Sequence, residues 1–452
     1  MSPLIIPETM KALVTQSNKT AVVQEIPVPT IDDNEILVQT VAVALNPTDW
    51  KFIETVSRAG TICGCDWSGY VVQKGENVTT LKIGDRVAGF VQGGTYTDRG
   101  AYAEYVKTTA DLAWKIPAGT VSDEEAATFG CADASSIGSI QQSKRSSTQR
   151  ALGSTGMFAL QLAKLAGYKI VSTCSPRNFE LVKSLGADVV VDYNDPDASK
   201  KIAEATGYTI HKAFDTISEA SSQKITIQAF APGPGKIIAT CPPVSEAQAL
   251  RDDVPIQQFT VWGQHFPASV EDKQHMACFL TKVSELVRTG AVEPNRTKLC
   301  EGGLKGINDG LRFLKEGKNS GKKIVYRLKE SERSLKVRKT PLIQAHTVWH
   351  ARRAVAAQML QDISPDADEQ AHILGDEYMD YLEWMGGLSE DEAKRRRCLG
   401  NESDMTKVTG ATVTTVQETQ APVATGVSNR AQATKRARVM VVVPSRKKQK
   451  VT

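Results

Sequence analysis

The alternation of short apolar runs with amphipathic stretches from residue 156 onwards constrains the fold of this chain most strongly. MFALQLAKLAG has apolar residues at a helical spacing, KIVSTC is typical of a strand, and FELVKSLG, ADVVVDY, KAFDTI and GKIIATC continue the series. Nearly all-apolar strands separated by helices are typical of a parallel sheet that helices cover on both faces. The sequence therefore predicts an α/β domain with a doubly wound parallel sheet.

The residues before this region have a different pattern. Between residues 10 and 130, short β-branched runs such as EILVQTVAVAL and DRVAGFV are separated by turns of Pro, Gly, Asp and Asn. This pattern predicts a compact, barrel-like β domain. Two helical patterns follow between residues 275 and 316, and the β-like KKIVYRL ends the folded part at Leu328.

The character of the sequence changes after Leu328. Residues 329–400 contain charged helical stretches, and residues 401–452 end in ATKRARVMVVVPSRKKQKVT, with no acidic residue after Glu418. We therefore expect a charged helical extension and then a disordered basic tail. Removal of everything after Leu328 is expected to leave the folded part unchanged.

A glycine-containing turn precedes the first helix of the alternating region. Gly153, Ser154, Thr155 and Gly156 would let the backbone approach a phosphate, and the helix N-terminus would offer N–H groups and a favourable dipole. A simple helix cap has the same composition. The turn alone leaves both interpretations open.

The loop after the next strand favours a nucleotide site. In a Rossmann unit this loop meets the adenosine ribose, where an acidic residue selects NAD and a cation accommodates the 2′-phosphate of NADP. Here KIVSTC is followed by Ser175, Pro176, Arg177 and Asn178, with no acid. A guanidinium with hydroxyl and amide donors beside it suits a phosphate dianion. The sequence thus favours NADP over NAD, with a solvated arginine as the alternative.

Six segments together carry a recognisable pattern. They are ALNPTDWK, GCDWSGYVVQKGENV, KIGDRVAGF, GAYAEYV, ALQLAKLAGYKIVSTCSPRNFELVKSLGAD and GKKIVYRL. Over residues 10–328 the chain resembles the medium-chain dehydrogenase/reductase superfamily, and within it the fungal trans-acting enoyl reductases that serve polyketide synthases. The resemblance implies a GroES-like catalytic domain at 1–130, completed by about 290–328, and a Rossmann NADP-binding domain at 131–289.

The resemblance also implies which residues contact NADPH in the cleft between the two domains. Thr48 and Lys51 would line the nicotinamide end, and Ser154 and Thr155 would contact the pyrophosphate. The other implied contacts are Ser175, Arg177 and Asn178 with the 2′-phosphate, Tyr193 with the adenosine, and Val325 with Tyr326 beside the cleft.

The zinc ligands of other superfamily members are missing. A catalytic zinc needs three protein ligands and an open position, which zinc-dependent relatives supply with an early cysteine and a later Gly-His-Glu. This chain has Asn-Pro-Thr at 46–48 and Gly-Cys-Asp at 64–66. It therefore resembles the zinc-independent branch, and we expect no metal.

The implied reaction is hydride delivery from NADPH to the β-carbon of an α,β-unsaturated thioester, followed by protonation of the α-carbon. Lys51 would stabilise the developing negative charge or guide a proton, and Thr48 would donate a hydrogen bond. An ordinary surface lysine is the alternative for Lys51. The thioester would arrive on the acyl carrier domain of a polyketide synthase, which is the partner that the resemblance implies.

The segment before the first helix conflicts with this resemblance. Family members have an apolar strand and a Gly-rich turn there, whereas residues 135–156 are SSIGSIQQSKRSSTQRALGSTG. Lys144, Arg145 and Arg150 would be buried in the middle of the sheet, where each unpaired charge costs several kcal/mol. Either the segment loops out and leaves a gap in the sheet, or the protein has lost its function, or the sequence is an incorrectly spliced gene model.

Two further functions compete with the enoyl reductase. One is an NADPH quinone or alkenal reductase, and the other is a non-catalytic relative whose basic tail directs it to the nucleus or to an acidic partner. A net charge of +4 is too small for bulk attraction to nucleic acid or membrane. Because neither a signal peptide nor a membrane-spanning run is apparent, we expect a cytoplasmic monomer, with a nuclear location as the alternative.

Overall fold

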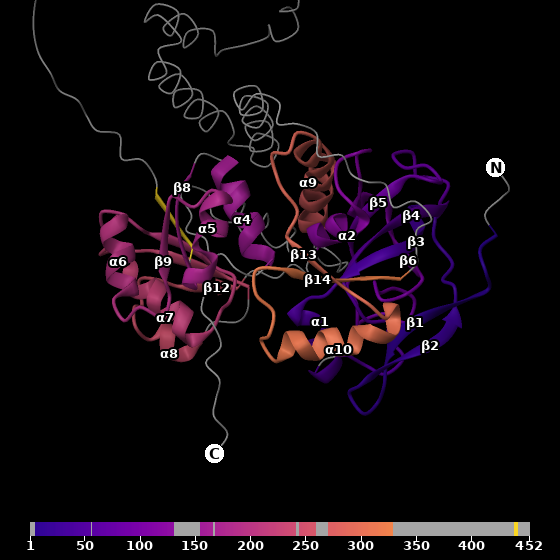
Figure 1. Ribbon diagram of the computed structural model, residues 1–452, viewed down its shortest axis with the longest axis horizontal. Coiled ribbons are helices and arrows are strands. Elements are labelled where there is room, and N and C mark those ends of the chain that lie inside the picture. The colour runs from indigo at the N-terminus through magenta and orange to yellow at the C-terminus, as the bar shows by residue number, and fades with distance from the viewer. Residues whose placement is uncertain are drawn as a thin grey trace, which may run out of the picture. The chain divides into compact units, whose positions relative to one another are not determined.

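The computed structural model describes residues 5–55, 57–130, 154–165, 168–240, 244–258, 270–328 and 438–441. Three predicted regions lie outside these residues: the segment before Ser154, which includes Gly153, the helical extension at 329–400, and the tail at 401–452 apart from 438–441. The described residues form two large sheets and a small one, with helices packed around them (Figure 1).

The first domain is built around a seven-stranded sheet with β3 (Glu35–Ala44) at its centre. Its residues EILVQTVAVA are apolar on both faces, and nine of the ten are buried. Strand β6 (Tyr105–Thr109) pairs with the first half of β3 and β14 (Lys323–Arg327) with its second half. Strand β4 (Asp66–Lys74) lies along the other edge of β3, and all three pairings are antiparallel. The strands before the second domain are β1 (Thr9–Thr15), β2 (Ala21–Pro27), β4 (Asp66–Lys74), β5 (Arg86–Phe90), β6 (Tyr105–Thr109) and β7 (Ala113–Lys115).

Short helices connect and extend this domain. They are α1 (Pro47–Thr55), η1 (Ala110–Leu112), α2 (Asp123–Ala126) and η2 (Ala127–Phe129). Ser122 caps α2 in a capping box, since its hydroxyl accepts from the Glu125 N–H at 3.1 Å while Glu125 accepts from the Ser122 N–H at 2.8 Å. Strand β1 pairs antiparallel with β2 in a separate two-stranded sheet.

The chain returns to the first domain after the second. Strands β13 (Thr297–Cys300) and β14 (Lys323–Arg327) join the first sheet, with Val325 opposite Ala44 of β3. Helix α10 (Gly303–Lys315) connects them and packs against α1 (Figure 1). Residues separated by more than two hundred positions thus form one sheet.

The second domain contains a six-stranded, wholly parallel sheet in the order β12-β11-β10-β15-β8-β9. Apolar runs form its strands, as the alternating pattern predicts. The strands are β8 (Lys169–Cys174), β9 (Val189–Asp192), β10 (Lys212–Asp215), β11 (Lys236–Ala239), β12 (Ile256–Gln258) and β15 (Arg438–Val441). The helices are α4 (Ser154–Leu165), η3 (Pro176–Asn178), α5 (Phe179–Ser184), α6 (Ala198–Ala205), α7 (Ala220–Ala229) and α8 (Ser245–Gln248).

Strand β15 corrects the prediction that the whole tail is disordered, and it argues against one of the three alternatives for the interrupted segment, the gap in the sheet. It lies between β8 and β10, so the described sheet has no gap at its centre (Figure 1, yellow). It also comes from the predicted disordered tail, so at least residues 438–441 are ordered as a strand. The tail contains the apolar run VMVVV, and apolar runs of this kind are typical of strands in parallel sheets.

Helix α9 (Val270–Arg288) contacts the first domain, although the sequence-based boundary places it in the second. Lys273 forms an ion pair with Asp111 at 3.3 Å, and the Ser284 hydroxyl donates to the Lys115 carbonyl at 2.6 Å.

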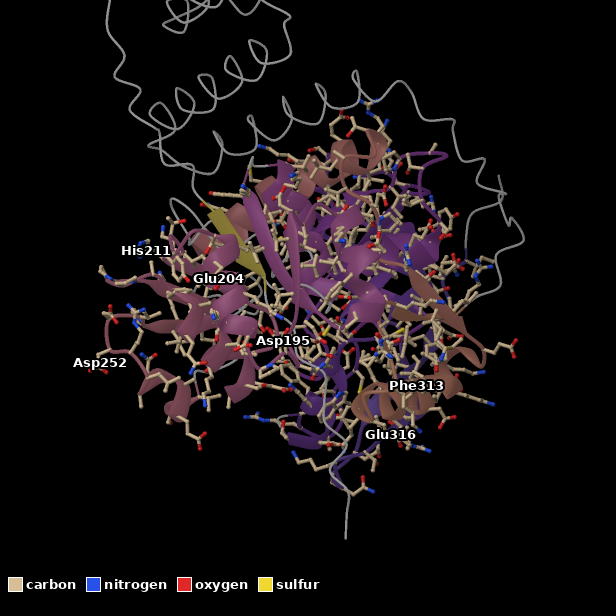
Figure 2. All side chains as sticks on the ribbon, turned by 60° about the vertical axis from the view of Figure 1, so that its left-hand side comes forward. Asp195, Glu204, His211, Asp252, Phe313 and Glu316 are labelled. Atoms are coloured by element: carbon tan, nitrogen blue, oxygen red, sulfur yellow. The ribbon has the colours of Figure 1, made fainter. Side chains whose placement is uncertain are left out.

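Charged side chains of the second domain, such as Glu204 and Asp252, point outward (Figure 2). Within the described ranges, no helix is both long and apolar enough to cross a membrane.

Candidate functional site

Three of the predicted site segments meet at one edge of the second sheet. Strand β8 ends at Cys174 and β9 at Asp192, so Ser175 and Tyr193 follow directly at the carboxyl edge. Helix α4 begins at Ser154 and leads into β8; because such a connecting helix runs antiparallel to the strands, its N-terminus lies at the same edge. Ligands of doubly wound sheets bind at this edge.

The loop after β8 has the chemistry of an anion site. Arg177 is exposed, and the Asn178 side-chain amide donates to Ser175 Oγ at 3.0 Å. In the described part of the chain, no carboxylate forms an ion pair with Arg177. A guanidinium, a hydroxyl and an amide without a competing anion fit a phosphate dianion.

A second loop reaches the same place from the first domain. The Asn178 amide also donates to Ser320 Oγ at 3.4 Å, and a Cβ added at Gly321 would lie 3.1 Å from Asn178 Oδ1. The two loops are 142 positions apart in the sequence. Sequence reasoning did not select Ser320, although its setting in GKNSGKK, rich in Gly and Lys, is a signal that points to an anion site.

The other residues predicted to contact the phosphates and adenosine occupy the same edge. Thr155 is half-buried in the first turn of α4, which is preceded in sequence by Gly153. Tyr193 is buried and packs in a cluster with Leu160, Ile170 and Cys174. Tyr193 therefore supports the carboxyl edge of the sheet, and its contact with the adenosine stays a prediction.

Polar groups after β10 and β11 were missed by sequence reasoning. Asp215 Oδ1 accepts from the N–H groups of Ile217 at 3.0 Å and Ser218 at 2.9 Å, which holds a tight turn with Ser218 at φ 59°. The hydroxyls of Ser218 and Thr240 lie 3.3 Å apart at the carboxyl edge. Asp215 is the last residue of the run KAFD and Thr240 directly follows KIIA, so a polar residue at the end of each buried run is the signal.

Thr48 and Lys51 lie on α1, in the first domain. Asp49, the third residue of the helix, closes its first turn, since its carboxylate accepts from the N–H of Asn46 just before the helix at 2.6 Å. Thr48 is half-buried, whereas Lys51 is exposed with its ammonium 5.8 Å from the ring centroid of Trp50. The two predicted catalytic side chains are thus neighbours on one helix.

A buried tyrosine anchors the first turn of α1. Gly64 has φ 88°, and a Cβ there would lie 2.3 Å from Tyr102 Cδ1, so glycine lets the ring pack closely. The Tyr102 hydroxyl donates to Asp49 Oδ2 at 2.6 Å. Burial raises the pKa of Asp49 to about 6, although the hydrogen bonds from Tyr102 and Asn46 act in the opposite direction.

A buried ion pair and a hydrogen bond from its ammonium involve Asp66 and Asn46, which belong to the two segments where the sequence lacks the zinc ligands of zinc-dependent relatives. Lys323 and Asp66, 3% and 0% exposed, form an ion pair at 2.9 Å, and the same ammonium donates to Asn46 Oδ1. An ammonium group between Asn46 and Asp66 does not fit a zinc ion. Among the residues with described side chains, no three His, Cys, Asp or Glu gather as metal ligands.

Val325 and Tyr326 are core residues of β14. Val325 packs with Ala42, Ala44 and Ala127, and Tyr326 is 3% exposed in the main core cluster. Burial raises the pKa of Tyr326 to about 12. These two side chains therefore belong to the core of the first domain, and their place beside the cleft stays a prediction.

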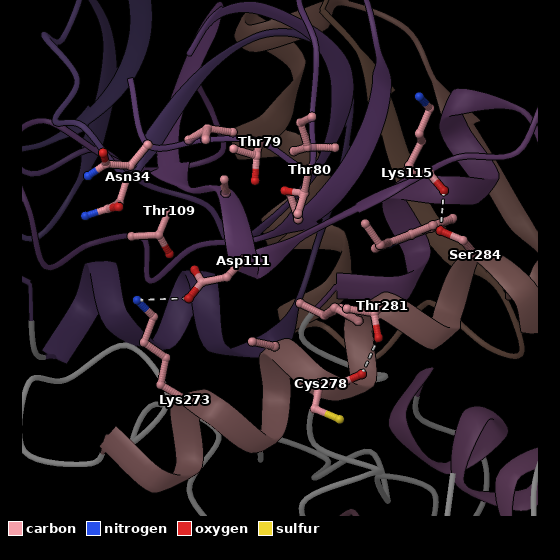
Figure 3. A pocket seen from close by; sticks show the side chains of 18 residues that line it. Asn34, Thr79, Thr80, Thr109, Asp111, Lys115, Lys273, Cys278, Thr281 and Ser284 are labelled. Carbon is pink, nitrogen blue, oxygen red and sulfur yellow. Dashed lines mark hydrogen bonds and ion pairs between the residues drawn. The ribbon is translucent and has the colours of Figure 1, made fainter. Parts of the chain in front are cut away.

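A cavity of about 620 Å³ lies elsewhere, between loops of the first domain and α9 (Figure 3). Its wall carries Thr79, Thr80 and Thr109, and the ion pair between Asp111 and Lys273 crosses one side. None of the predicted site residues lines it. The cavity is therefore separate from the predicted cofactor site at the sheet edge.

The comparisons with known proteins define the class first. Residues 32–118 match the alcohol dehydrogenase GroES-like domain, and residues 154–279 match the zinc-binding dehydrogenase family. The solved CurK enoyl reductase has a TM-score of 0.59 at 19% identity, covering 71% of this chain and 99% of that one. The fold is therefore a GroES-like domain joined to a Rossmann-type domain, as predicted.

Two curated relatives then give the family. The trans-enoyl reductase ACTTS2 of Alternaria alternata is 37% identical over 342 residues, covering 71% of this chain and 99% of that protein. The trans-enoyl reductase resD of Aspergillus sclerotiorum is 36% identical, covering 71% of this chain and 100% of that protein. The chain belongs to the medium-chain dehydrogenase/reductase superfamily and, within it, to the trans-enoyl reductases. The predicted family is confirmed.

Proposed function

We propose that this protein is an NADPH-dependent, trans-acting enoyl reductase that reduces the α,β double bond of a polyketide thioester held on an acyl carrier domain. The observation that carries the reaction type is its 37% identity to a trans-enoyl reductase along nearly the whole of that protein. The choice of cofactor rests on a different observation, the exposed Arg177 between Ser175 and Asn178 at the carboxyl edge of the sheet.

The chain's own residues have separate tasks in this proposal. Bound NADPH supplies the hydride that the β-carbon receives. Arg177 and the hydroxyl of Ser175 bind the 2′-phosphate, and the N–H groups at the start of α4 bind the pyrophosphate. Thr48 and Lys51 on α1 stabilise the negative charge that develops on the thioester oxygen, before the α-carbon takes up a proton.

The buried groups beneath α1 position these two side chains. Asp49 and Tyr102 fix the first turn of the helix, and Lys323 holds Asn46 just before it. Because an oriented donor contributes more to catalysis than a mobile one, rigid support for Thr48 fits a reaction that depends on positioning.

Stopped-flow measurement of NADPH oxidation tests the reaction directly. We expect rapid oxidation with a crotonyl thioester and much slower oxidation with a quinone or a free alkenal. Rapid turnover of the quinone and none of the thioester would instead establish the quinone or alkenal reductase. If the protein binds NADPH but neither substrate class causes its oxidation, the protein is a non-catalytic relative.

The partner is tested with the same substrate on two carriers. We expect kcat/KM to be higher for a crotonyl group on a polyketide synthase acyl carrier domain than on a short pantetheine thiol. The pantetheine control contains the same thioester without protein contacts, so equal values would argue against a carrier partner. Sedimentation of the purified enzyme tests the accompanying proposal that it is a monomer.

A further inference from the structure

The strand at the centre of the cofactor sheet comes from the far end of the chain. Strand β15 pairs in parallel with β8 over four residue pairs, from Arg438 opposite Lys169 to Val441 opposite Ser172. On its other side it pairs with β10, through Ala213 and Phe214. Met440 has a partner on both sides, so it occupies a fully central position in the sheet.

The strand order shows which place β15 occupies. A doubly wound dinucleotide-binding sheet has the order 3-2-1-4-5-6, with its first strand at the centre. Here β9, β8, β10, β11 and β12 hold the places of strands three, two, four, five and six. Strand β15 holds the first place, which a strand directly before α4 normally fills.

The neighbours of β15 require a partner at this place. Ile170 and Val171 of β8, and Ala213 and Phe214 of β10, are all buried to within a few per cent. Without a strand between them, the facing edges of β8 and β10 would carry buried N–H and C=O groups with no hydrogen-bond partner. The sequence of residues 135–150 contains no apolar run, whereas residues 438–441 are RVMV.

The long connection from Leu328 does not prevent this arrangement. The entropic cost of closing a loop grows only with the logarithm of its length. A strand that returns from a distant segment therefore loses little compared with one that returns from nearby.

We propose that β15 replaces the first strand of the cofactor domain, and that binding of the dinucleotide depends on it. The facing edges of β8 and β10 then bind one parallel strand of this chain, β15. Because β15 is aligned with β8 up to Ser172, it supports the strand whose end carries Ser175 and Arg177. The structural part of this inference is independent of the proposed function, whereas its effect on NADPH rests on that function.

Hydrogen exchange on the full-length protein tests the strand itself. We expect the amides of residues 439–441 to exchange at least about a hundredfold more slowly than in a peptide of the same sequence, as do those of β8 and β10. If the amides of residues 439–441 exchange as fast as in the peptide while those of β8 and β10 are protected, the proposal is overturned.

Two proline variants connect the strand to cofactor binding. Met440→Pro removes an N–H from the middle of the ladder, whereas Thr434→Pro changes the chain just before β15 and is the matched control. Met440→Pro is expected to lower protection in β8 and β10, leave β3 and β4 unchanged, and weaken NADPH binding about tenfold or more. Equal binding by Met440→Pro, Thr434→Pro and the parent would contradict the dependence on β15.

Failure of this inference can be separated from failure of the proposed function. If the parent protein binds NADPH but the amides of 438–441 are not protected from hydrogen exchange, the proposed function stands and the replacement of the first strand by β15 is contradicted. A protein with strong protection at 438–441 and no NADPH binding would retain the strand and lose the reductase. If Met440→Pro is insoluble, the exchange of the parent still decides the structural part.

Discussion

Arg177 follows a strand whose last five residues are buried, so its guanidinium stands at the end of a fixed apolar support. A turn closed by the Asn178 N–H on the Ser175 carbonyl at 2.9 Å holds it there. The same turn contacts Ser320, from a loop of the first domain. At the scale of single residues, two domains therefore share the predicted 2′-phosphate site.

Arg177→Ala should weaken NADPH binding about 10- to 100-fold, because a hydrogen bond to a charged group is lost, and should leave NADH binding nearly unchanged. Isothermal titration with both dinucleotides measures this. Lys183→Ala on α5 removes an exposed cation paired with Glu180 and serves as the control. A parallel loss of affinity for both dinucleotides would indicate a general structural effect rather than recognition of the 2′-phosphate.

Asp49 predicts a pH dependence with a definite sign. Burial raises its pKa from 3.8 to about 6 in the folded protein, so the folded state binds more protons than the unfolded state between these values. The protonated carboxyl group contributes fully to the free energy of unfolding below about pH 3.8. This contribution is lost as the pH rises through about 6, and the loss amounts to about 3 kcal/mol. Asp49→Asn should therefore gain about that much relative to the parent between pH 4 and pH 7.

Urea unfolding of both proteins at several pH values measures this difference. Asp309→Asn, at an exposed carboxylate, is the control and should show no comparable change. A parent and an Asp49→Asn variant whose stabilities run parallel from pH 4 to pH 7 would show that Asp49 titrates as an ordinary surface carboxyl.

The buried pair of Lys323 and Asp66 gives a third prediction. Lys323→Met leaves a buried carboxylate without its ammonium partner and should lower the free energy of unfolding by about 3–5 kcal/mol. Adding Asp66→Asn should recover part of this loss, because the uncompensated charge is removed. A double variant less stable than Lys323→Met, measured by urea unfolding, would argue against electrostatic coupling of the pair.

At the scale of elements, β15 changes the expectation for the region after Leu328. A chain ending at Leu328 lacks the central strand of the second sheet, so that domain should unfold more easily than in the full-length protein. Thermal unfolding should show a lowered Tm, whereas a chain ending at Val443, which keeps β15, should retain it. Equal Tm values for all three would restore the simpler view of the tail as dispensable.

Local pattern predicted most of the elements. The runs KIVSTC, KAFDTI and GKIIATC became strands where the alternation placed them, because apolar strands between helices have few other folded solutions. Strand β15 was missed because the basic residues around VMVVV have the composition of a disordered tail. Only its neighbours in the sheet, which are distant in sequence, give that run a structure.

Long-range contacts also explain what was missed in the site. Ser320 gains its place from a contact with Asn178 across 142 positions, and the buried support of Asp49 by Tyr102 spans 53 positions. The loop at 175–178 was predictable because strand, turn and cation are contiguous. The loop at 175–178 was thus found from sequence, whereas Ser320 and Tyr102, which long-range contacts place, were not.

At the scale of the whole molecule, the first domain contributes α1, the second contributes the sheet edge, and the loop containing Ser320 joins them. The chain passes from the first domain to the second and back, which brings catalytic candidates and cofactor candidates from separate segments. Dinucleotide binding by the full-length chain is therefore the property on which reaction, strand replacement and residue roles all depend.

Calorimetric titration of the full-length protein with NADPH and NADH tests this most directly. The account predicts saturable heat with NADPH at a Kd at least about tenfold lower than with NADH, since one phosphate contact distinguishes the two. Absence of binding heat with either dinucleotide at several temperatures, in protein with a cooperative unfolding transition, would contradict it.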